Sequence, residues 1–437
     1  MQGVPEDIGC GSGVAADAER SLPAGERLRQ RSRRIAVICG HFMPEVGYQE
    51  VWIARTLARL GQRVRVITST RVSMSARKVL RTPYPAGHSV ESDGYELLRL
   101  RPLAWFRSAV WAPGVAAALE EFRPELLLLL GVGKLFGVRD ALRYAQRTGT
   151  PLIAVFSELE EYRLRHTPYL AVRAWLQDLG FALLKQRVYR GVIRHARLLV
   201  CNMPATQQWL LQRCRTDAER EQVRTKARVL SLGYDRERYF FDAAARQEMR
   251  QRWGCTEQEV VLLTVTRLEP YKGLERVIAA VGQLQRQGLP VRYILVGGLQ
   301  DSYQQHVAQF IAQQPQPERF AIVPFQPAEL VRRYACAADL GIWMQPAIST
   351  QEAMGTGLPV LLPNRESLVH LLQEGVTGWY WREPDGFEQR LQEVVVQLSG
   401  RSEPERCRER QRLAHVNAQR FSYEAILEQV FGLAGLL

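Results

Sequence analysis

The sequence lacks any uninterrupted run of about eighteen apolar residues, so no segment is expected to span a membrane. Its seven cysteines are scattered, odd in number and never spaced as Cys-x-x-Cys. That spacing argues against a disulfide framework or a structural zinc site and favours a reducing compartment. The amino terminus has no hydrophobic region of the kind found in secretory signals. These absences predict a cytoplasmic protein.

Glycine motifs of common nucleotide cofactors are also missing. The loop at residues 40–50 follows the first expected strand but has no Gly-x-Gly-x-x-Gly, which counts against a nicotinamide or flavin site. Residues 131–134, Gly-Val-Gly-Lys, lack the Gly-Lys-Ser/Thr ending of a phosphate-binding loop, so an ordinary tight turn is the preferred interpretation. No cofactor is therefore expected.

Basic residues outnumber acidic ones, 58 to 45, and the net charge is +13. Residues 163–228 hold fourteen Lys or Arg and four Asp or Glu, a local net charge of +10. Such a segment could contact an anionic membrane surface or a phosphorylated substrate, or could simply be a solvated face. No nucleic-acid-binding module accompanies it, so nucleic acid is not an expected partner.

Hydrophobic patterning divides the chain of 437 residues into several parts. Residues 1–34 are rich in Gly, Ala, Glu and Arg and are expected to be disordered. From residue 35 to about 240, short apolar runs alternate with helical segments, as in a parallel α/β domain. The expected strands there are residues 33–39, 64–68, 97–100, 126–130, 152–156 and 198–201.

The second half repeats this pattern from residue 241 to 414. A strand at 260–265, a helix carrying apolar residues from Leu274 to Leu284, and a strand at 291–296 predict a parallel βαβ unit. Further strands are expected at residues 321–325, 340–344 and 359–362. The fold class is therefore α/β, with two doubly wound Rossmann-like domains facing a central cleft, and residues 415–437 as a terminal helix.

The residues after the strand at 260–265 suggest a binding site. Arg267 and Lys272 lie five apart at the carboxyl end of that strand, where open α/β sheets bind ligands, and the pair could clamp a diphosphate. Glu352 lies beside a later helix start, where its carboxylate could accept both hydroxyl hydrogens of a ribose. An exposed basic pair without function is the alternative for the two cations.

The motifs in the second half resemble the donor half of family 4 glycosyltransferases, which have the GT-B fold. The motifs that carry this resemblance are Arg-x4-Lys-Gly at 267–273, Ala338-Asp339, Glu352-Ala353-Met354, Gly357 and Pro359-Val360. It covers nearly the whole chain after residue 34. It implies an acceptor-side domain at residues 35–240, a nucleotide-sugar donor domain at 241–414, and a terminal helix at 415–437 that packs across the junction.

The resemblance also implies roles for particular residues. The implied catalytic residues are Arg267, Lys272 and Glu352. The implied donor-binding residues are Gly47, Gly298, Phe325, Ser349 and Thr350. Contact with the acceptor or the transferred sugar is implied for Tyr48 and Glu158. No metal site is implied.

Three positions depart from the pattern of that family. Met344 lies where the family usually has the first of two glutamates, separated by seven residues from the second, which is Glu352 here, and a thioether cannot carry charge. Val46-Gly47-Tyr48 replaces a pair of adjacent glycines, and Ser157-Glu158 replaces a His-Asp pair. The part of the donor site that contacts the sugar is therefore expected to be altered.

The resemblance implies a transferase that moves a sugar from a nucleotide-diphosphate sugar to an acceptor, with retention of anomeric configuration and without a metal. The sequence does not identify the acceptor, which could be lipid-linked, a polysaccharide or a small molecule. A non-catalytic nucleotide-sugar-binding partner of a glycosylation complex is the alternative that Met344 supports. A sugar-nucleotide epimerase is disfavoured because residues 344–352 contain no histidine. The expected location is the cytoplasm, with peripheral contact at the cytoplasmic face of a membrane.

Overall fold

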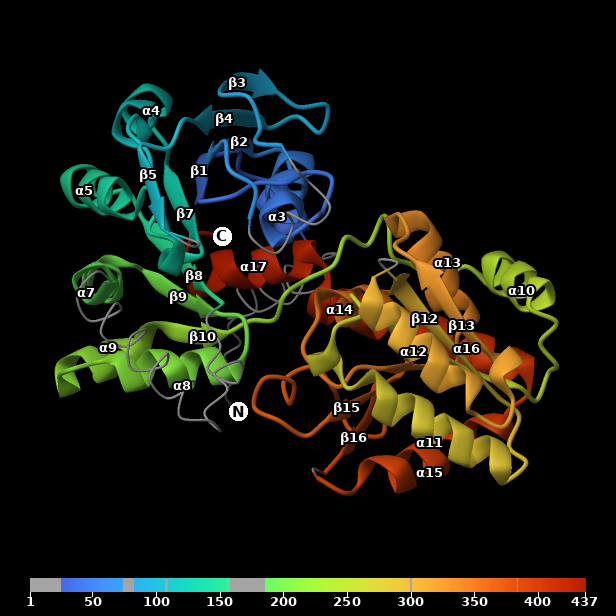
Figure 1. The fold of residues 1–437 in the computed structure, drawn as a ribbon. Coiled ribbons are helices and arrows are strands. Elements are labelled where there is room, and N and C mark those ends of the chain that lie inside the picture. The colour runs from blue at the N-terminus through green and yellow to red at the C-terminus, as the bar shows by residue number, and fades with distance from the viewer. Residues whose placement is uncertain (1–24, 74–81, 107–108, 158–184, 299–300, 383) are drawn as a thin grey trace, which may run out of the picture.

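The computed structural model describes residues 25–73, 82–106, 109–157, 185–298, 301–382 and 384–437. Two separate sheets, one from each half of the chain, lie side by side and are covered by helices (Figure 1). Among the described helices, none is both long enough and apolar enough to cross a membrane.

The first sheet has eight strands in the order β10-β9-β8-β7-β1-β2-β4-β3. β3 pairs antiparallel with β4, and the other described pairings in this sheet are parallel. Its strands are β1 (Arg34–Cys39), β2 (Arg63–Ser69), β3 (Gly87–Val90), β4 (Glu96–Leu100), β7 (Leu126–Leu130), β8 (Leu152–Phe156), β9 (Leu198–Cys201) and β10 (Ala227–Val229). A separate antiparallel hairpin joins β5 (Ala104–Phe106) to β6 (Ala109–Trp111).

Helices cover both faces of this sheet, which explains why its central strands are apolar throughout. All five leucines of β7 are buried, since strands between two helical layers have no solvent-facing side. One face packs against α4 (Val115–Phe122), α5 (Val138–Thr148), α7 (Gln186–His195), α8 (Pro204–Arg213) and α9 (Asp217–Lys226). The other face packs against α2 (Glu26–Arg29), α3 (Gln49–Arg59) and α17 (Tyr423–Leu433).

The second sheet has six parallel strands in the order β13-β12-β11-β14-β15-β16. They are β11 (Val260–Val265), β12 (Val291–Gly298), β13 (Phe320–Pro324), β14 (Leu340–Ile342), β15 (Val360–Pro363) and β16 (Gly378–Trp381). The helices around it are α10 (Ala243–Arg252), α11 (Leu274–Arg286), α12 (Ser302–Ala312), α13 (Ala328–Ala337), α14 (Ile348–Gly355), α15 (Phe387–Ser399) and α16 (Glu403–Phe421). Short 3₁₀ turns lie at η1 (Val132–Lys134), η3 (Pro270–Lys272) and η4 (Pro317–Arg319).

A buried ion cluster ties the helices of the second domain to the end of its sheet. The carboxylate of Asp339 lies 2.6 Å from Arg246 Nη2 and 2.8 Å from Arg250 Nη1, and Glu403 forms a further ion pair with Arg246. The arginines hold the pKa of Asp339 far below its usual range despite complete burial. Because the cluster joins α10, α16 and the start of β14, it sets how these elements pack.

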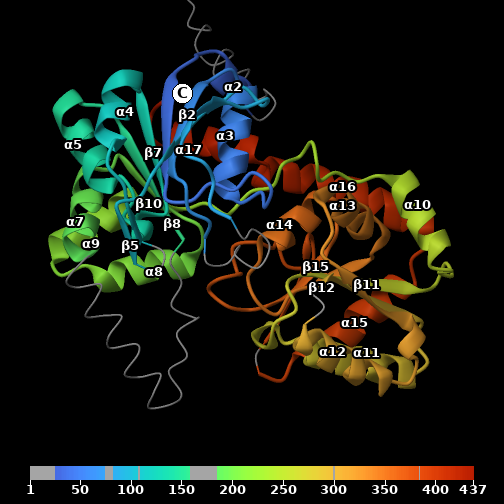
Figure 2. The same ribbon diagram turned by 45° about the horizontal axis from the view of Figure 1, so that its top comes forward.

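The chain crosses between the two domains at two neighbouring places. Tyr234 N donates to Phe421 O at 2.9 Å, and Tyr423 N donates to Tyr234 O at 3.1 Å. The crossing segments are thus paired like two short strands, with a parallel bridge between Tyr234 and Ser422. α17 then packs on the first domain although it follows the second in sequence (Figures 1 and 2).

Two expected boundaries differ from the structure. Residue 415 falls inside α16, and the terminal helix that reaches the first domain begins at Tyr423, after the capping residue Ser422. Residues 25–34, expected to be disordered, include helix α2, whose Leu28 is completely buried in the core of the first domain. An apolar side chain within a polar segment is enough to attach that segment to a nearby core.

Candidate functional site

A cavity of about 530 Å³ lies between the two domains. The first domain contributes the loop before α3, and the second contributes the carboxyl ends of β11 and β12, the residues after β13, and the start of α14. This is the edge at which open parallel sheets bind ligands. The residues that line it include Gly47, Tyr48, Trp52, Arg238, Tyr239, Arg267, Gly297, Phe325, Ser349 and Glu352.

Gly47 shapes the first-domain wall of this cavity. Its φ is +67°, and a Cβ added there would lie 2.9 Å from Cζ2 of Trp52, so a side chain would collide with the indole. Tyr48 is the capping residue of α3, which begins without a side-chain cap. The positive end of the α3 dipole therefore lies at the cavity wall, where it favours an anion.

Arg267 and Lys272 lie in the loop and short helical turn after β11. The Arg267 guanidinium lines the cavity, is 41% exposed, and has Glu269 as an ion-pair partner at 3.4 Å. Lys272 is not among the lining residues, but its ammonium interacts electrostatically with Arg267. Burial, and then the charge of Arg267, lower the pKa of Lys272 to about 8. Two neighbouring cations whose positive charge is only partly neutralised by Glu269 are suited to binding a diphosphate.

Glu352 lies on α14 and lines the cavity from the second domain. Burial raises the pKa of its carboxyl to about 7, while a hydrogen bond donated by the Tyr239 hydroxyl opposes that rise. Tyr239 comes from the segment that crosses between the domains and is 4% exposed. The Glu352 carboxyl is thus a hydrogen-bond acceptor in the cavity, and its charge changes with pH around neutrality.

The other residues implied for donor binding differ in position. Ser349 lines the cavity, but its hydroxyl donates to Val265 O at 2.6 Å and accepts from Trp343 Nε1 at 3.2 Å, so it already braces the cavity wall. Phe325 also lines the cavity, and its ring is 57% exposed. The ring therefore offers an accessible face to a base or a sugar.

Thr350 and Gly298 do not line the cavity. The Thr350 side chain is completely buried and does not line the cavity, so direct contact between its hydroxyl and a ligand is not supported. Gly297 lines the cavity in place of its neighbour Gly298. Gly297 has φ +122°, and a Cβ there would lie 2.1 Å from Thr266 O, so this position requires glycine.

Met344 is 9% exposed and packs against the turn that carries Lys272. A Cβ added to Gly273 would lie 3.4 Å from Cβ and Cγ of Met344, so the thioether side chain occupies the back of that turn. Met344 does not line the cavity. Glu158 lies outside the described residues, as do residues 163–184 of the basic segment.

Several cavity residues were missed by the sequence analysis. Trp52 faces Gly47 and stacks with two arginines, Arg55 at 5.0 Å and Arg238 at 4.7 Å from its ring centroid. Neither Arg238 nor Tyr239 belongs to a periodic pattern, because both lie in the irregular crossing segment. The adjacent glycines at 297 and 298 could have indicated a close backbone approach at the end of a strand. Only the backbone angles show that Gly297 is the one that must be glycine. In the described part of the chain, no three His, Cys, Asp or Glu side chains are grouped to hold a metal.

Comparison with known proteins places this geometry in context. Residues 245–413 match the family model described as glycosyl transferases group 1. HepE of Anabaena, solved with UDP and glucose, superposes with a TM-score of 0.61 at 19% identity, covering 93% of this chain and 100% of that one. Sucrose-phosphate synthase of Thermosynechococcus elongatus superposes with a TM-score of 0.63 at 18% identity, covering 92% and 98%. The fold is GT-B.

One sequence relative is also a glycosyltransferase by name. The amylovoran biosynthesis glycosyltransferase AmsK of Erwinia amylovora is 29% identical over 154 residues, which make up 32% of this chain. The match spans 36% of the length of that relative. At these identities the structural neighbours establish the two-domain architecture, and the family model bears on the second domain.

Proposed function

We propose that this protein is a glycosyltransferase that takes its sugar from a nucleotide-diphosphate sugar bound in the cavity between the domains. The observation that carries the proposal is the convergence of Gly47, Arg267 and Glu352 on one cavity from both domains. The family match over residues 245–413 supports the same reaction class. The neighbour HepE was solved with UDP-glucose as well as with UDP, which agrees with a nucleotide-sugar in this position.

In this proposal the cations act on the leaving group. As the bond between sugar and diphosphate breaks, negative charge grows on the diphosphate, and Arg267 with Lys272 neutralises it. In a water-poor cleft, removing one such donor costs about 3 kcal/mol of transition-state stabilisation. Ionised Glu352 accepts hydrogen bonds from the ribose hydroxyls, and Tyr239 holds its carboxylate in place. Gly47 allows the loop backbone and Tyr48 to approach the transferred sugar.

The finer features of the reaction are part of the proposal. Retention of configuration, membership of family 4 and the absence of a required metal or cofactor follow from the sequence resemblance. The same holds for a role in glycan biosynthesis and a cytoplasmic location. The acceptor is a hydroxyl compound that reaches the cavity from the first-domain side, where Tyr48 lies.

A donor screen tests the proposal. Nucleotide-sugars with different bases and sugars are compared by thermal shift, and any that stabilise the protein are then incubated with acceptor mixtures and followed by mass spectrometry. Arg267→Ala is expected to abolish the donor-induced shift. Arg252→Ala removes an exposed arginine from the end of α10 in the same domain, and its shift is expected to match the parent. No stabilisation by any nucleotide-sugar or nucleoside diphosphate would contradict the proposal.

A second candidate is a non-catalytic partner that binds a nucleotide-sugar within a glycosylation complex. Met344 favours it, because a buried thioether cannot offer the hydrogen bonds to a sugar that a carboxylate offers. A protein that binds one donor tightly, yet neither transfers nor hydrolyses it with any acceptor, would support this candidate over the enzyme.

A further inference from the structure

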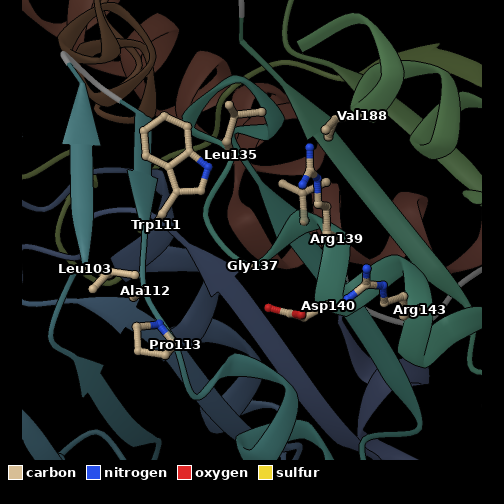
Figure 3. Close-up of a pocket in the computed structure, with 11 residues that line it drawn as sticks. Leu103, Trp111, Ala112, Pro113, Leu135, Gly137, Arg139, Asp140, Arg143 and Val188 are labelled. Carbon is tan, nitrogen blue, oxygen red and sulfur yellow. The ribbon is translucent and has the colours of Figure 1, made fainter. Parts of the chain in front are cut away.

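A second cavity, of about 380 Å³, has all of its lining residues in the first domain. It opens between the hairpin β5–β6 and the start of α5, and it shares no lining residue with the cavity between the domains. Figure 3 shows Leu103, Trp111 and Pro113 on one side of this hollow and Arg139 and Arg143 on the other. The cavity thus has an apolar wall facing a cationic one.

The apolar wall is presented to solvent by the strands of this hairpin. Leu103 N donates to Trp111 O at 2.8 Å at the base of the hairpin, which holds both residues in register. Leu103 is 82% exposed and Trp111 is 37% exposed. Large apolar side chains exposed together mark an interaction surface, and tryptophan is suited to the interface between water and lipid.

The cationic wall comes from the first turns of α5. Arg139 and Arg143 are four residues apart and therefore lie on one face of the helix. Both are exposed, and within the described residues neither guanidinium has a hydrogen-bond or ion-pair partner. Asp140 contributes one carboxylate to the lining, which leaves the wall with a net positive charge. α5 begins after Gly137 without a side-chain cap, so its dipole adds to the positive potential.

We propose that this cavity binds the phosphate-bearing head group of an anionic membrane lipid and holds the first domain at a bilayer surface. Guanidinium groups bind phosphates through paired hydrogen bonds, and the side chains of Leu103 and Trp111 enter the region of the acyl chains. A free phosphate would leave these two side chains in water, which is why the combination favours a lipid. The inference does not depend on the reaction proposed for the other cavity.

Vesicle sedimentation tests the cationic wall. The parent is expected to bind vesicles of mixed phosphatidylglycerol and phosphatidylcholine, and to bind pure phosphatidylcholine much more weakly. Arg139→Gln with Arg143→Gln is expected to weaken binding to the anionic vesicles about 30-fold. Each basic side chain near such a surface contributes about 1 kcal/mol of binding free energy, and the contributions of the two arginines together correspond to that factor. Arg252→Gln with Arg286→Gln makes the same change in net charge on the second domain and is expected to bind like the parent. Equal weakening by both double variants would mean diffuse charge attraction and would overturn the proposal.

The apolar wall is tested with Leu103→Ser, which alters an exposed side chain and leaves the core intact. About tenfold weaker vesicle binding is expected, with an unchanged melting temperature. Binding equal to that of the parent would overturn the proposal, because the hairpin would then take no part. Competition identifies the source of the phosphate: the vesicles should displace inorganic phosphate, and tight binding of inorganic phosphate alone, without vesicle binding, would equally overturn it.

Discussion

Replacing Glu352 with Gln is expected to change folding stability and nucleotide affinity in opposite directions. Burial raises the pKa of this carboxyl from its usual 4.5 to about 7, so its ionised form costs free energy in the folded protein. Gln has nearly the same shape and keeps an oxygen that can accept the hydrogen bond from Tyr239. It therefore removes the cost of burying a charge and leaves the local packing intact.

The magnitude follows from the two pKa values. Their difference corresponds to at most about 3.4 kcal/mol between the protonation states, and we expect about 2 kcal/mol because Glu352 is partly exposed to solvent. The folded state binds the proton more tightly, so the parent loses stability as the pH rises from about 4.5 to about 7 and then stays at the lower level. The variant lacks this loss, and its advantage is thus present at pH 7 and above and absent in acid.

Nucleotide binding is expected to change in the other direction. If Glu352 accepts two hydrogen bonds from a ribose, one of them is lost when an acceptor oxygen becomes an amide donor. A hydrogen bond to a charged group is worth about 1.5–3 kcal/mol, so the affinity for a nucleoside diphosphate should fall about tenfold or more.

Denaturant unfolding at about pH 5 and about pH 8 measures the first effect, and calorimetric titration with a nucleoside diphosphate measures the second. Glu424→Gln is a suitable control, since burial also raises the pKa of Glu424, which lies on α17 and does not line the cavity. Its nucleotide affinity should equal that of the parent. A Glu352→Gln protein that binds nucleotide as tightly as the parent would refute the ribose contact. Equal stability of parent and variant at both pH values would refute the reasoning from burial.

Four further predictions follow from the same structure. Arg267→Ala or Lys272→Ala should each cost about 2–4 kcal/mol of transition-state stabilisation, measured as kcat/KM on the best donor, and unchanged turnover in both would contradict a diphosphate clamp. Because the pKa of Lys272 is lowered to about 8, nucleotide affinity should fall as the pH rises through that value, whereas Lys272→Arg should keep its affinity; a flat profile in the parent would speak against this role. Met344→Glu should alter donor preference with little effect on nucleoside diphosphate affinity, since the resemblance places this position at the transferred sugar, and a large loss of affinity would contradict that placement. Asp339→Asn should lower the free energy of unfolding by about 3–5 kcal/mol in denaturant titrations, because it leaves buried arginines without their partner, and a loss of less than about 1 kcal/mol would show that the cluster is not needed.

Much of the fold could be predicted because its signals are local. The five leucines of β7 and the run Val260–Val265 indicate buried parallel strands in any α/β protein, and the structure forms strands over both. Boundaries were harder where they depend on a single residue. Ser422 ends one helix and caps the next, and this break depends on the conformation of that one residue.

The candidate site could be predicted only in part. Glu352 and Arg267 were identified from motif spacing, and the structure brings them to one cavity. Thr350 lies between the cavity residues Ser349 and Glu352 in sequence, yet its side chain is completely buried, because neighbouring positions on a helix face different directions. Nothing in the sequence pattern indicated that Tyr239 belongs to the site, since it lies in an irregular segment without periodicity.

By itself, the sequence determined the alternation of strands and helices, the two-domain division and the residue types available for a diphosphate and a ribose, because periodicity and side-chain chemistry are local properties. The tertiary structure decided which of those residues share a cavity and how strongly they hold their protons. Glu352 meets Tyr239, and Arg139 and Trp111 come to line one cavity, only after distant segments have folded together. Burial and charge proximity depend on such neighbours, so neither the raised pKa of Glu352 nor the amphipathic cavity of the first domain could be read along the chain.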